Sequence, residues 1–236
     1  MSWCKPVLHN AVLASSLVIL SSPVVSTAGG LAISDTRLIL ENGQTSGALV
    51  LRNTTPNQFL TKCWISELNR TPTENIIAAP PVAFSPPNKH IRFQVVILRP
   101  EELPSDRESI FRFHTHSVPL KSDAKNSLEI SYDMQVKVFY RPKGLEGNMT
   151  EAIEDLQWSL KKGTLTATNN SKYNISLVTY GVEKDFQGLK NFVLAPESSA
   201  SFKLKKTYPD RVQIRWAAID DYGSPVRRST VITNEK

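Results

Sequence analysis

The longest alternation of apolar and polar positions in the chain runs from Ser127 to Tyr140. Successive side chains point to opposite faces of a β-strand, so this pattern predicts one long strand. The apolar positions on one of its faces are Leu128, Ile130, Tyr132, Met134, Val136, Val138 and Tyr140. An extended segment of this length would reach about 46 Å, whereas a strand of about 6 residues already crosses an ordinary core. Two interpretations follow: a long core strand buried at both ends, or an apolar edge kept open for another chain.

Shorter alternating runs, bounded by proline, glycine and asparagine, fill the rest of the chain. In a first block, strands are expected at residues 31–40, 47–52, 59–66, 76–84, 90–98 and 109–118. In a second block, they are expected at residues 156–160, 165–169, 173–180, 192–194, 201–204 and 212–218, followed by a tail that ends at Ile232. No segment after residue 28 shows the helical period over a convincing length. The sequence therefore predicts an all-β protein of the sandwich type.

A polar stretch that contains glycine separates the two blocks and covers residues 143–149. This composition is typical of a linker between domains. We therefore expect an N-terminal domain at residues 29–142, which includes the long strand, and a C-terminal domain at residues 150–236.

The first 28 residues have the composition of a secretory signal peptide. A single charge, Lys5, precedes an apolar run from Ala11 to Leu20, and residues 26–28 follow the small-x-small pattern of a cleavage site. The run is shorter than the roughly 20 residues that span a bilayer, so export is favoured over a membrane anchor. After this leader the only cysteine is Cys63, which we interpret as a small core residue because it lies in an apolar run.

The chain lacks strong signs of catalysis or nucleic-acid binding. Its formal charge of +6 favours acidic partners but does not by itself indicate a nucleic acid. No phosphate-binding glycine loop and no nucleophile elbow is present in the sequence. His114 and His116 share one face of a predicted strand and could offer two nitrogens to a metal ion, but the chain has only four histidines. Asp220 and Asp221 precede a glycine, a setting more typical of turn hydrogen bonds or a salt bridge.

Two cations stand out within apolar strands. Lys137 occupies the polar face of the long strand, and Arg37 lies inside the first predicted strand. One interpretation makes both solvated charges on an outer face. The other places both in a cleft, where two cations without a matching acid are costly unless an anion such as a carboxylate binds there.

Four short segments follow one another at a characteristic spacing. They are Thr36-Arg37, the segment from Leu103 to Ser109, the segment from Lys137 to Pro142 and the segment from Ile219 to Gly223. In that order they resemble the periplasmic pilus chaperones of the chaperone-usher pathway, across essentially the whole chain after the leader. The resemblance implies two immunoglobulin-like β-sandwich domains set in an L with a cleft between them. It implies a periplasmic location, no cofactor and no nucleic acid partner.

The resemblance also implies how the protein would work. Members of this family bind pilin subunits that lack their last strand, and lend them a strand by donor-strand complementation. Carried over by position, Arg37 and Lys137 anchor the C-terminal carboxylate of the subunit. The donor side chains would be Leu128, Ile130 and Tyr132, with Met134 as a further candidate. The outer-membrane usher would receive the subunit, and another subunit's extension would displace the strand without ATP.

Three further features belong to the same resemblance. Glu108, Arg141 and Asp221 match the ionic network that fixes the angle between the domains in this family. The short, cysteine-free connection from Val118 to Ser127 resembles the short-loop class of these chaperones. Tyr132 departs from the family, which usually has an aliphatic residue there.

Other readings of the sequence remain alternatives. A structural or adhesive immunoglobulin-like pilus component would need an N-terminal donor extension and an incomplete sandwich, whereas the first predicted strand starts almost at the cleavage site. A metal-dependent hydrolase rests on His114 and His116 alone. Self-association of the free form would be another way to cover the donor edge.

Overall fold

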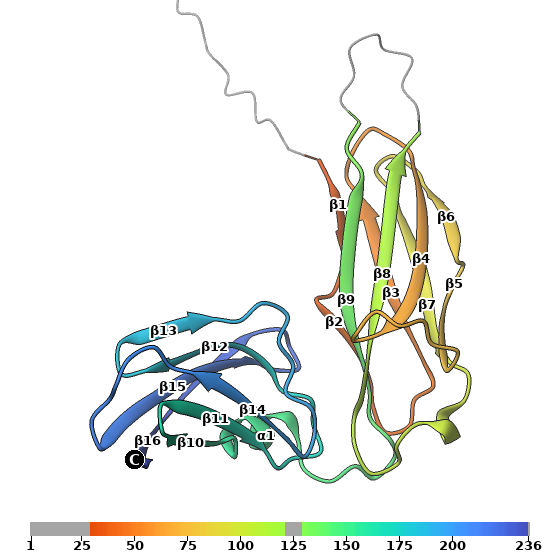
Figure 1. Ribbon diagram of the computed structural model, residues 1–236. Helices are drawn as coiled ribbons and strands as arrows, with labels where there is room; N and C mark the ends of the chain where they lie inside the picture. Colours follow the sequence, from red (N-terminus) through yellow and green to blue (C-terminus); the bar gives the residue numbers. More distant parts are fainter. Residues whose placement is uncertain (1–28, 121–128, 236) are drawn as a thin grey trace, which may run out of the picture.

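The computed structural model describes residues 29–120 and 129–235 and consists almost entirely of β-strands (Figure 1). It forms two sandwiches set at an angle, so that the outline is an L. The predicted fold class, two immunoglobulin-like β-sandwich domains, is thereby confirmed. The predicted signal peptide, residues 1–28, lies outside the described residues, as does Leu128. Within the described part, no helix is long and apolar enough to cross a membrane.

The N-terminal sandwich contains two sheets. The first has the order β1 (Leu31–Ile33), β3 (Ser46–Asn53), β7 (His90–Ile97) and β5 (Ile76–Ala79). The second has the order β2 (Arg37–Leu40), β9 (Tyr132–Tyr140), β8 (Ser109–Pro119), β4 (Phe59–Glu67) and β6 (Val82–Ser85). A short 3₁₀ turn, Pro100–Glu102, precedes β8. Alternate residues of both sheets, among them Phe93 and Phe113, meet in one buried cluster.

The C-terminal sandwich has a core of its own, in which Trp158 and Trp216 pack against each other. One of its faces consists of β13 (Asp185–Gly188), β12 (Ser176–Val182), β15 (Arg211–Ile219) and β16 (Pro225–Glu235). The other consists of β10 (Gln157–Lys161), β11 (Thr164–Asn169) and β14 (Ser198–Lys203). The two faces are joined because the end of β16 pairs in parallel with β10.

Two expected strands are each divided in the structure. Residues 31–40 form β1 and β2, which belong to different sheets, because the chain crosses the sandwich at Ser34-Asp35-Thr36. Residues 76–84 form β5 and β6, also in different sheets, with Pro80-Pro81 between them. Proline has no N–H to donate to a ladder. The strand therefore stops at these prolines, although the apolar residues continue beyond them. The expected strand at 192–194 is reduced to one bridge, between Ile175 and Leu194.

The predicted long strand is also shorter than expected. β9 begins at Tyr132, which pairs with Ser117 of β8. Continued pairing would bring Ile130 opposite Pro119, the last residue of β8, which has no N–H. The ladder therefore ends where its partner can no longer donate.

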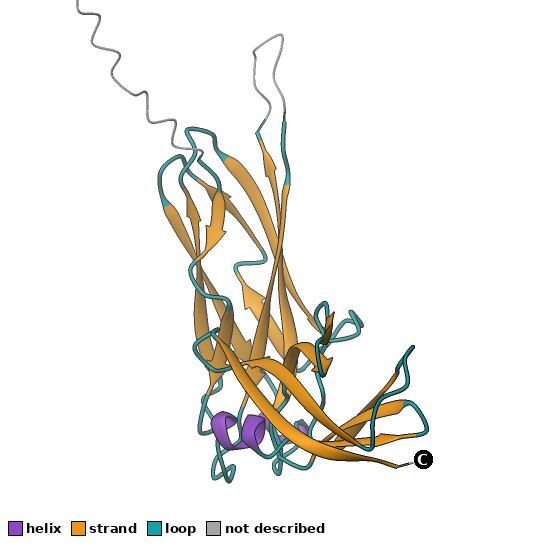
Figure 2. Cartoon of the chain, turned by 90° about the vertical axis from the view of Figure 1, so that its left-hand side faces the viewer, coloured by secondary structure: helices purple, strands orange, loops and turns teal. Residues whose placement is uncertain are grey.

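One short helix occurs among the described residues, and its six residues are too few to give a helical period of convincing length in the sequence. Helix α1 (Met149–Glu154) begins at the last residue of the expected linker, and Figure 2 shows how little of the chain is helical. The side chain of Asn148 caps it by accepting a hydrogen bond from the N–H of Glu151 at 3.0 Å. Met149, Ala152 and Ile153 are buried, and their spacing puts them on one face of the helix.

Candidate functional site

Arg37 and Lys137 come together in the structure although a hundred residues of chain separate them. β2 and β9 pair in parallel, and the register puts the Cα of Arg37 beside the Cα of Lys137. The side chains of residues paired in this way leave the sheet on the same face. The two cations that the sequence singled out are therefore neighbours.

Lys137 reaches from the N-terminal sandwich to the C-terminal one. Its Nζ donates a hydrogen bond to Oγ of Ser176, the first residue of β12, at 3.0 Å. Burial, with smaller contributions from Arg37 and Arg112, lowers the pKa of Lys137 to about 8. The ammonium group therefore lies at a contact between the two domains, where losing its proton is easier than in water.

Arg37 is half-buried beside it. Its guanidinium lies over the ring of Phe139, 5.6 Å from the centroid, and its Nε is buried without a hydrogen-bond partner among the described residues. Burial lowers the pKa of Arg37, although the carboxylates of Asp221 and Asp220 oppose this shift. Within the described chain, neither Arg37 nor Lys137 forms an ion pair. The pair thus has unused capacity for an anion.

A third cation, which the sequence analysis missed, extends this row. Arg112 on β8 lies directly opposite Lys137 and donates a hydrogen bond to the side chain of Gln135 at 3.0 Å. Burial lowers its pKa as well. Aligning β8 against β9 in antiparallel register would have found it. Three neighbouring strands therefore place a positive charge at the same level of the sheet.

One edge of β9 is only partly covered. β8 pairs with β9 along its whole length, but β2 pairs only with Lys137 to Tyr140. No strand of the described chain pairs with the opposite edge of β9 from Tyr132 to Val136. This edge has free main-chain groups and begins next to the cation pair, so another strand could add there.

The predicted donor residues differ in how far their side chains are buried. Tyr132 and Met134 pack at the margin of the N-terminal core, and the Tyr132 ring meets Phe59 edge-on at 5.7 Å. Ile130 precedes the strand and is 53% exposed. Leu128 lies outside the described residues. Of the described candidates, only Ile130 presents most of an apolar side chain to solvent.

Glu108, Arg141 and Asp221 form one hydrogen-bonded cluster where the two domains meet. Arg141 donates from Nε to Glu108 at 2.8 Å, and from Nη1 and Nη2 to both oxygens of Asp221 at 2.9 and 2.6 Å. Bidentate pairing of this kind fixes the guanidinium plane. Burial alone would lower the Arg141 pKa, but its bonds to Asp221 and Glu108 outweigh that effect and raise it. The three residues predicted to interact are therefore in direct contact.

Sequence reasoning missed three other members of this cluster. Glu41 accepts a hydrogen bond from Arg141 at 2.9 Å, and the guanidinium lies over the ring of Tyr173, 5.0 Å from its centroid. The main-chain N–H of Asn174 donates to Oε1 of Glu108 at 3.0 Å. The pKa of Glu108 is raised, because the effect of burial is larger than the opposing effects of Arg141 and Asn174. Both domains therefore supply donors to one buried carboxylate.

Close backbone packing supports this contact. Gly223 has a positive φ of 83°, and a Cβ there would collide with the hydroxyl of Thr36. Glycine lets the turn after Asp221 approach β2 without strain. The N–H of Glu108 also donates to the main-chain oxygen of Lys172 at 2.9 Å.

The remaining candidate residues have ordinary contacts. His114 stacks on Trp64 and shares a hydrogen bond with the Ser66 hydroxyl at 2.9 Å, while His116 contacts Asp133 at 2.7 Å. No group of three or more His, Cys, Asp or Glu suited to a metal ion occurs in the described residues. Asp220 accepts turn hydrogen bonds from two main-chain N–H groups. Cys63 is buried, and burial raises its thiol pKa to about 12.

Comparison with known proteins identifies two family models along the chain. The model described as "Pili and flagellar-assembly chaperone, PapD N-terminal domain" matches residues 30–146. The model described as "Pili assembly chaperone PapD, C-terminal domain" matches residues 151–230.

Individual proteins agree with these models. The chaperone protein FimB/FhaD of Bordetella pertussis is 31% identical over 226 residues, which cover 90% of this chain and 92% of that protein. The crystal structure of the YadV chaperone matches with a TM-score of 0.74 at 26% identity, over 86% of this chain and 99% of that one. The complex of the Salmonella enterica SafA pilin with the SafB chaperone shares the fold, with a TM-score of 0.74 at 18% identity, over 88% and 98% of the two chains. The two domain models and the similarity to FimB/FhaD point to the same family. The chain therefore belongs to the PapD-like pilus-assembly chaperones of the chaperone-usher pathway, a family of binding proteins and not of enzymes.

Proposed function

We propose that this pilus-assembly chaperone binds pilin subunits by donor-strand complementation, with the C-terminal carboxylate of the subunit held by Arg37 and Lys137. The observation that carries the proposal is the position of these two cations side by side, where Lys137 contacts the C-terminal domain. Two half-buried cations that form no ion pair with a described residue cost free energy, and a carboxylate would offset that cost through charge-assisted hydrogen bonds.

The uncovered edge of β9 supports the same mechanism. A subunit strand that ends at the cation pair would run along Tyr132 to Val136 and satisfy main-chain groups that β2 leaves free. Strand addition obtains affinity from these hydrogen bonds and specificity from side-chain pockets. Ile130 and Tyr132 would then fill the groove of the subunit, with Met134 and Leu128 on the same face of the strand.

The cellular context follows from the same proposal. The N-terminal leader would direct the chain to the periplasm, where the outer-membrane usher receives the loaded chaperone. The solved complex of SafA pilin with SafB is consistent with a pilin as partner. A role as a pilus component is less well supported, because the N-terminal sandwich has two sheets and the C-terminal one has two faces formed by one continuous sheet.

The Lys137→Met substitution tests the anchor. It removes the ammonium and keeps an unbranched side chain of similar length. Truncating one side of a buried charge pair costs about 3 kcal/mol, so we expect subunit binding to fall roughly a hundredfold. The measurement is the amount of pilin that co-purifies with the tagged chaperone from periplasm.

Lys89→Met is the matched control, because Lys89 is exposed and lies before β7, away from the cleft. Circular dichroism would show that both variants keep the wild-type fold. Pilin recovery at the wild-type level with Lys137→Met would exclude the anchoring role.

A further inference from the structure

The sheet that contains Ser176 also carries a groove on the outer face of the C-terminal sandwich. The groove has a volume of about 660 Å³ and lies over β12, β13, β15 and β16. Thr179, Ala217 and Ser229 line its floor, and all three are small. The register places Thr179 beside Ala217 on adjacent strands.

One wall is a large apolar side chain held out of the core. Phe186 on β13 lies opposite Gly181, and its side chain is 53% exposed. A Cβ at Gly181 would be 2.6 Å from the Phe186 ring. Glycine therefore lets the ring pack directly on the backbone of β12. Exposed aromatic rings next to a small-residue floor are typical of binding surfaces.

The groove is positively charged. Arg215 and Arg227 line it, and no carboxylate does. Arg215 donates to the main-chain oxygen of Glu183 at 3.0 Å and to the side chain of Gln213. No hydrogen bond or ion pair to the Arg227 side chain occurs within the described residues, and this side chain is exposed. An acidic group in the groove would therefore meet an unpaired arginine.

The groove lies along the same strand as the residue that Lys137 contacts. Ser176, which accepts the Lys137 hydrogen bond, and Thr179, which lines the groove, belong to the same strand. Three residues along a strand cover roughly 10 Å. Figure 1 shows that β12 and β13 lie on the side of the C-terminal sandwich that faces the inner angle of the L. A ligand held at Lys137 would thus extend over this face.

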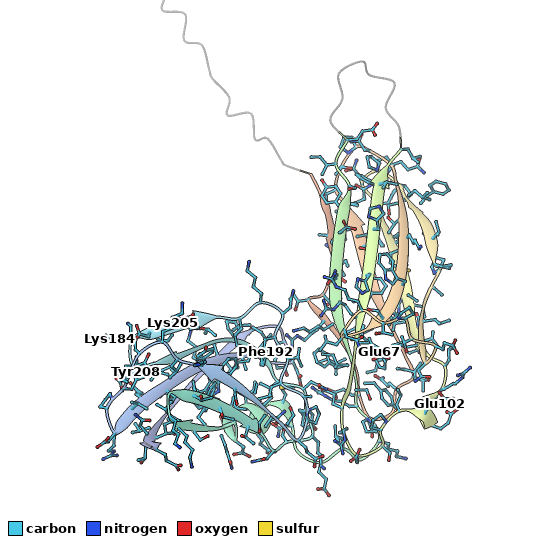
Figure 3. The ribbon with its side chains drawn as sticks, in the orientation of Figure 1. Glu67, Glu102, Lys184, Phe192, Lys205 and Tyr208 are labelled. Atoms are coloured by element: carbon cyan, nitrogen blue, oxygen red, sulfur yellow. The ribbon has the colours of Figure 1, made fainter. Side chains whose placement is uncertain are left out.

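A second hollow on the same sandwich also touches β12, through Tyr180 and Val182, but begins farther from Ser176 along the strand. It is lined by Lys205 and Tyr208 among others. Figure 3 shows both residues, with Lys184, at the end of the C-terminal sandwich away from the N-terminal one. The groove beside Thr179 is therefore the nearer of the two to Ser176 along β12.

We propose that this groove is a second docking surface for the same pilin subunit, which presents to it an apolar side chain flanked by a carboxylate. The apolar side chain packs against Phe186 and Ala217, and the carboxylate pairs with Arg227. This inference rests on the proposed function, because the occupant is the subunit anchored at Lys137. Its consequence is that the C-terminal domain takes part in choosing among subunits.

The test is a competition for a limiting amount of subunit during refolding. The probes are the subunit that co-purifies with the wild-type protein and a synthetic peptide of its last 15 residues. Tagged Arg227→Glu competes against the untagged wild-type protein for the whole subunit. We expect the wild-type protein to capture about ten times more subunit, as one reversed charge pair predicts. The peptide, which reaches only the anchor and β9, should bind both proteins equally.

Lys162→Glu is the matched control, because Lys162 is exposed at the turn between β10 and β11, outside the groove. Phe186→Ser should weaken subunit capture without reversing a charge. Equal capture by Arg227→Glu and the wild-type protein would overturn the inference. So would a parallel loss of peptide binding, or an equal loss in Lys162→Glu. If Lys137→Met captured both probes normally, the proposed function itself would fail.

Discussion

At the scale of single residues, Lys137 combines a structural cost with its proposed binding role. Its pKa of about 8 is below the usual value for lysine because of burial first, and then Arg37 and Arg112. A native pKa below the unfolded one makes the protonated lysine destabilising. This cost is fully present below about pH 8 and is relieved as the pH rises toward the unfolded value near 10.4. A bound carboxylate stabilises the protonated form and offsets the cost.

The affinity for the carboxylate should therefore depend on pH. For the C-terminal peptide of a co-purified subunit, we expect the affinity to be constant below about pH 8. Above it, the affinity should fall by up to tenfold per pH unit as Lys137 loses its proton. Fluorescence anisotropy between about pH 7 and 9.5 would measure this.

The control for this prediction is Lys137→Arg, whose guanidinium stays charged throughout the range. Its peptide affinity, whether higher or lower than that of the wild-type protein, should not change with pH. A wild-type affinity that is flat up to about pH 9.5 would contradict the assignment of Lys137 as the titrating anchor.

At the scale of elements, β9 is divided into two functional parts. Lys137 to Tyr140 are paired on both sides and contribute three core residues, whereas Tyr132 to Val136 are paired only with β8. A free apolar edge of this kind promotes aggregation unless a partner covers it. The same strand therefore holds the fold together at one end and offers an edge at the other.

Amide hydrogen exchange can detect this division. In the free protein, amides of Tyr132 to Val136 that point to the open edge should exchange much faster than those of Lys137 to Tyr140. Adding subunit should slow the fast group and leave the slow one unchanged. Strong protection of the open edge in dilute free protein would contradict the prediction. Protection that rises with protein concentration would indicate self-association.

The hydrophobic pattern predicted the elements better than their limits. Alternation located β3, β4, β7 and β8 because their inward side chains do enter the core. It could not show that β1 and β2 belong to different sheets, since both have apolar residues facing the same core. It also extended β9 too far, because the ladder ends at a partner residue, Pro119, and not at a change within the strand itself.

At the scale of the whole molecule, Arg141 and Glu108 join the two sandwiches. Arg141 follows β9 directly, and its bidentate partner Asp221 belongs to the C-terminal sandwich. The side chain of Glu108 is fully buried and accepts hydrogen bonds from both domains. Such a buried network sets geometry more reliably than it adds stability. The angle of the L, and with it the position of Ser176 near Lys137, depends on this cluster.

Removing one buried carboxylate should therefore cost far more than removing an exposed one. Glu108→Ala removes the carboxylate that accepts hydrogen bonds from Arg141 and Asn174 and leaves these buried donors unpaired. We therefore expect the free energy of unfolding to fall by about 3 kcal/mol. Glu41→Ala is the matched control: it removes a carboxylate that contacts the same arginine but is 61% exposed. Its expected effect is below about 1 kcal/mol. Equal effects of the two substitutions in urea denaturation would contradict a structural role for the buried cluster.

The candidate site could be predicted only in part. The strand pattern singled out Arg37 and Lys137, and family resemblance identified the Glu108–Arg141–Asp221 set. The structure brings each group together. Ser176, Asn174 and the groove beside Thr179 were not foreseeable. They depend on contacts between the domains and on pairings between distant strands, neither of which leaves a local pattern in the sequence.

The proposed anchor would also fix the register between the subunit strand and β9, because the parallel register of β2 and β9 sets the position of Lys137. If the terminal carboxylate always stops at Lys137, every residue of the incoming strand is counted from the end of the subunit. In a subunit with one extra residue after its last apolar position, the whole strand would shift by one residue. Its apolar side chains would then point to the opposite face. Subunits that share this chaperone are therefore expected to agree in the spacing between their apolar residues and their C-terminus, even where the residues themselves differ.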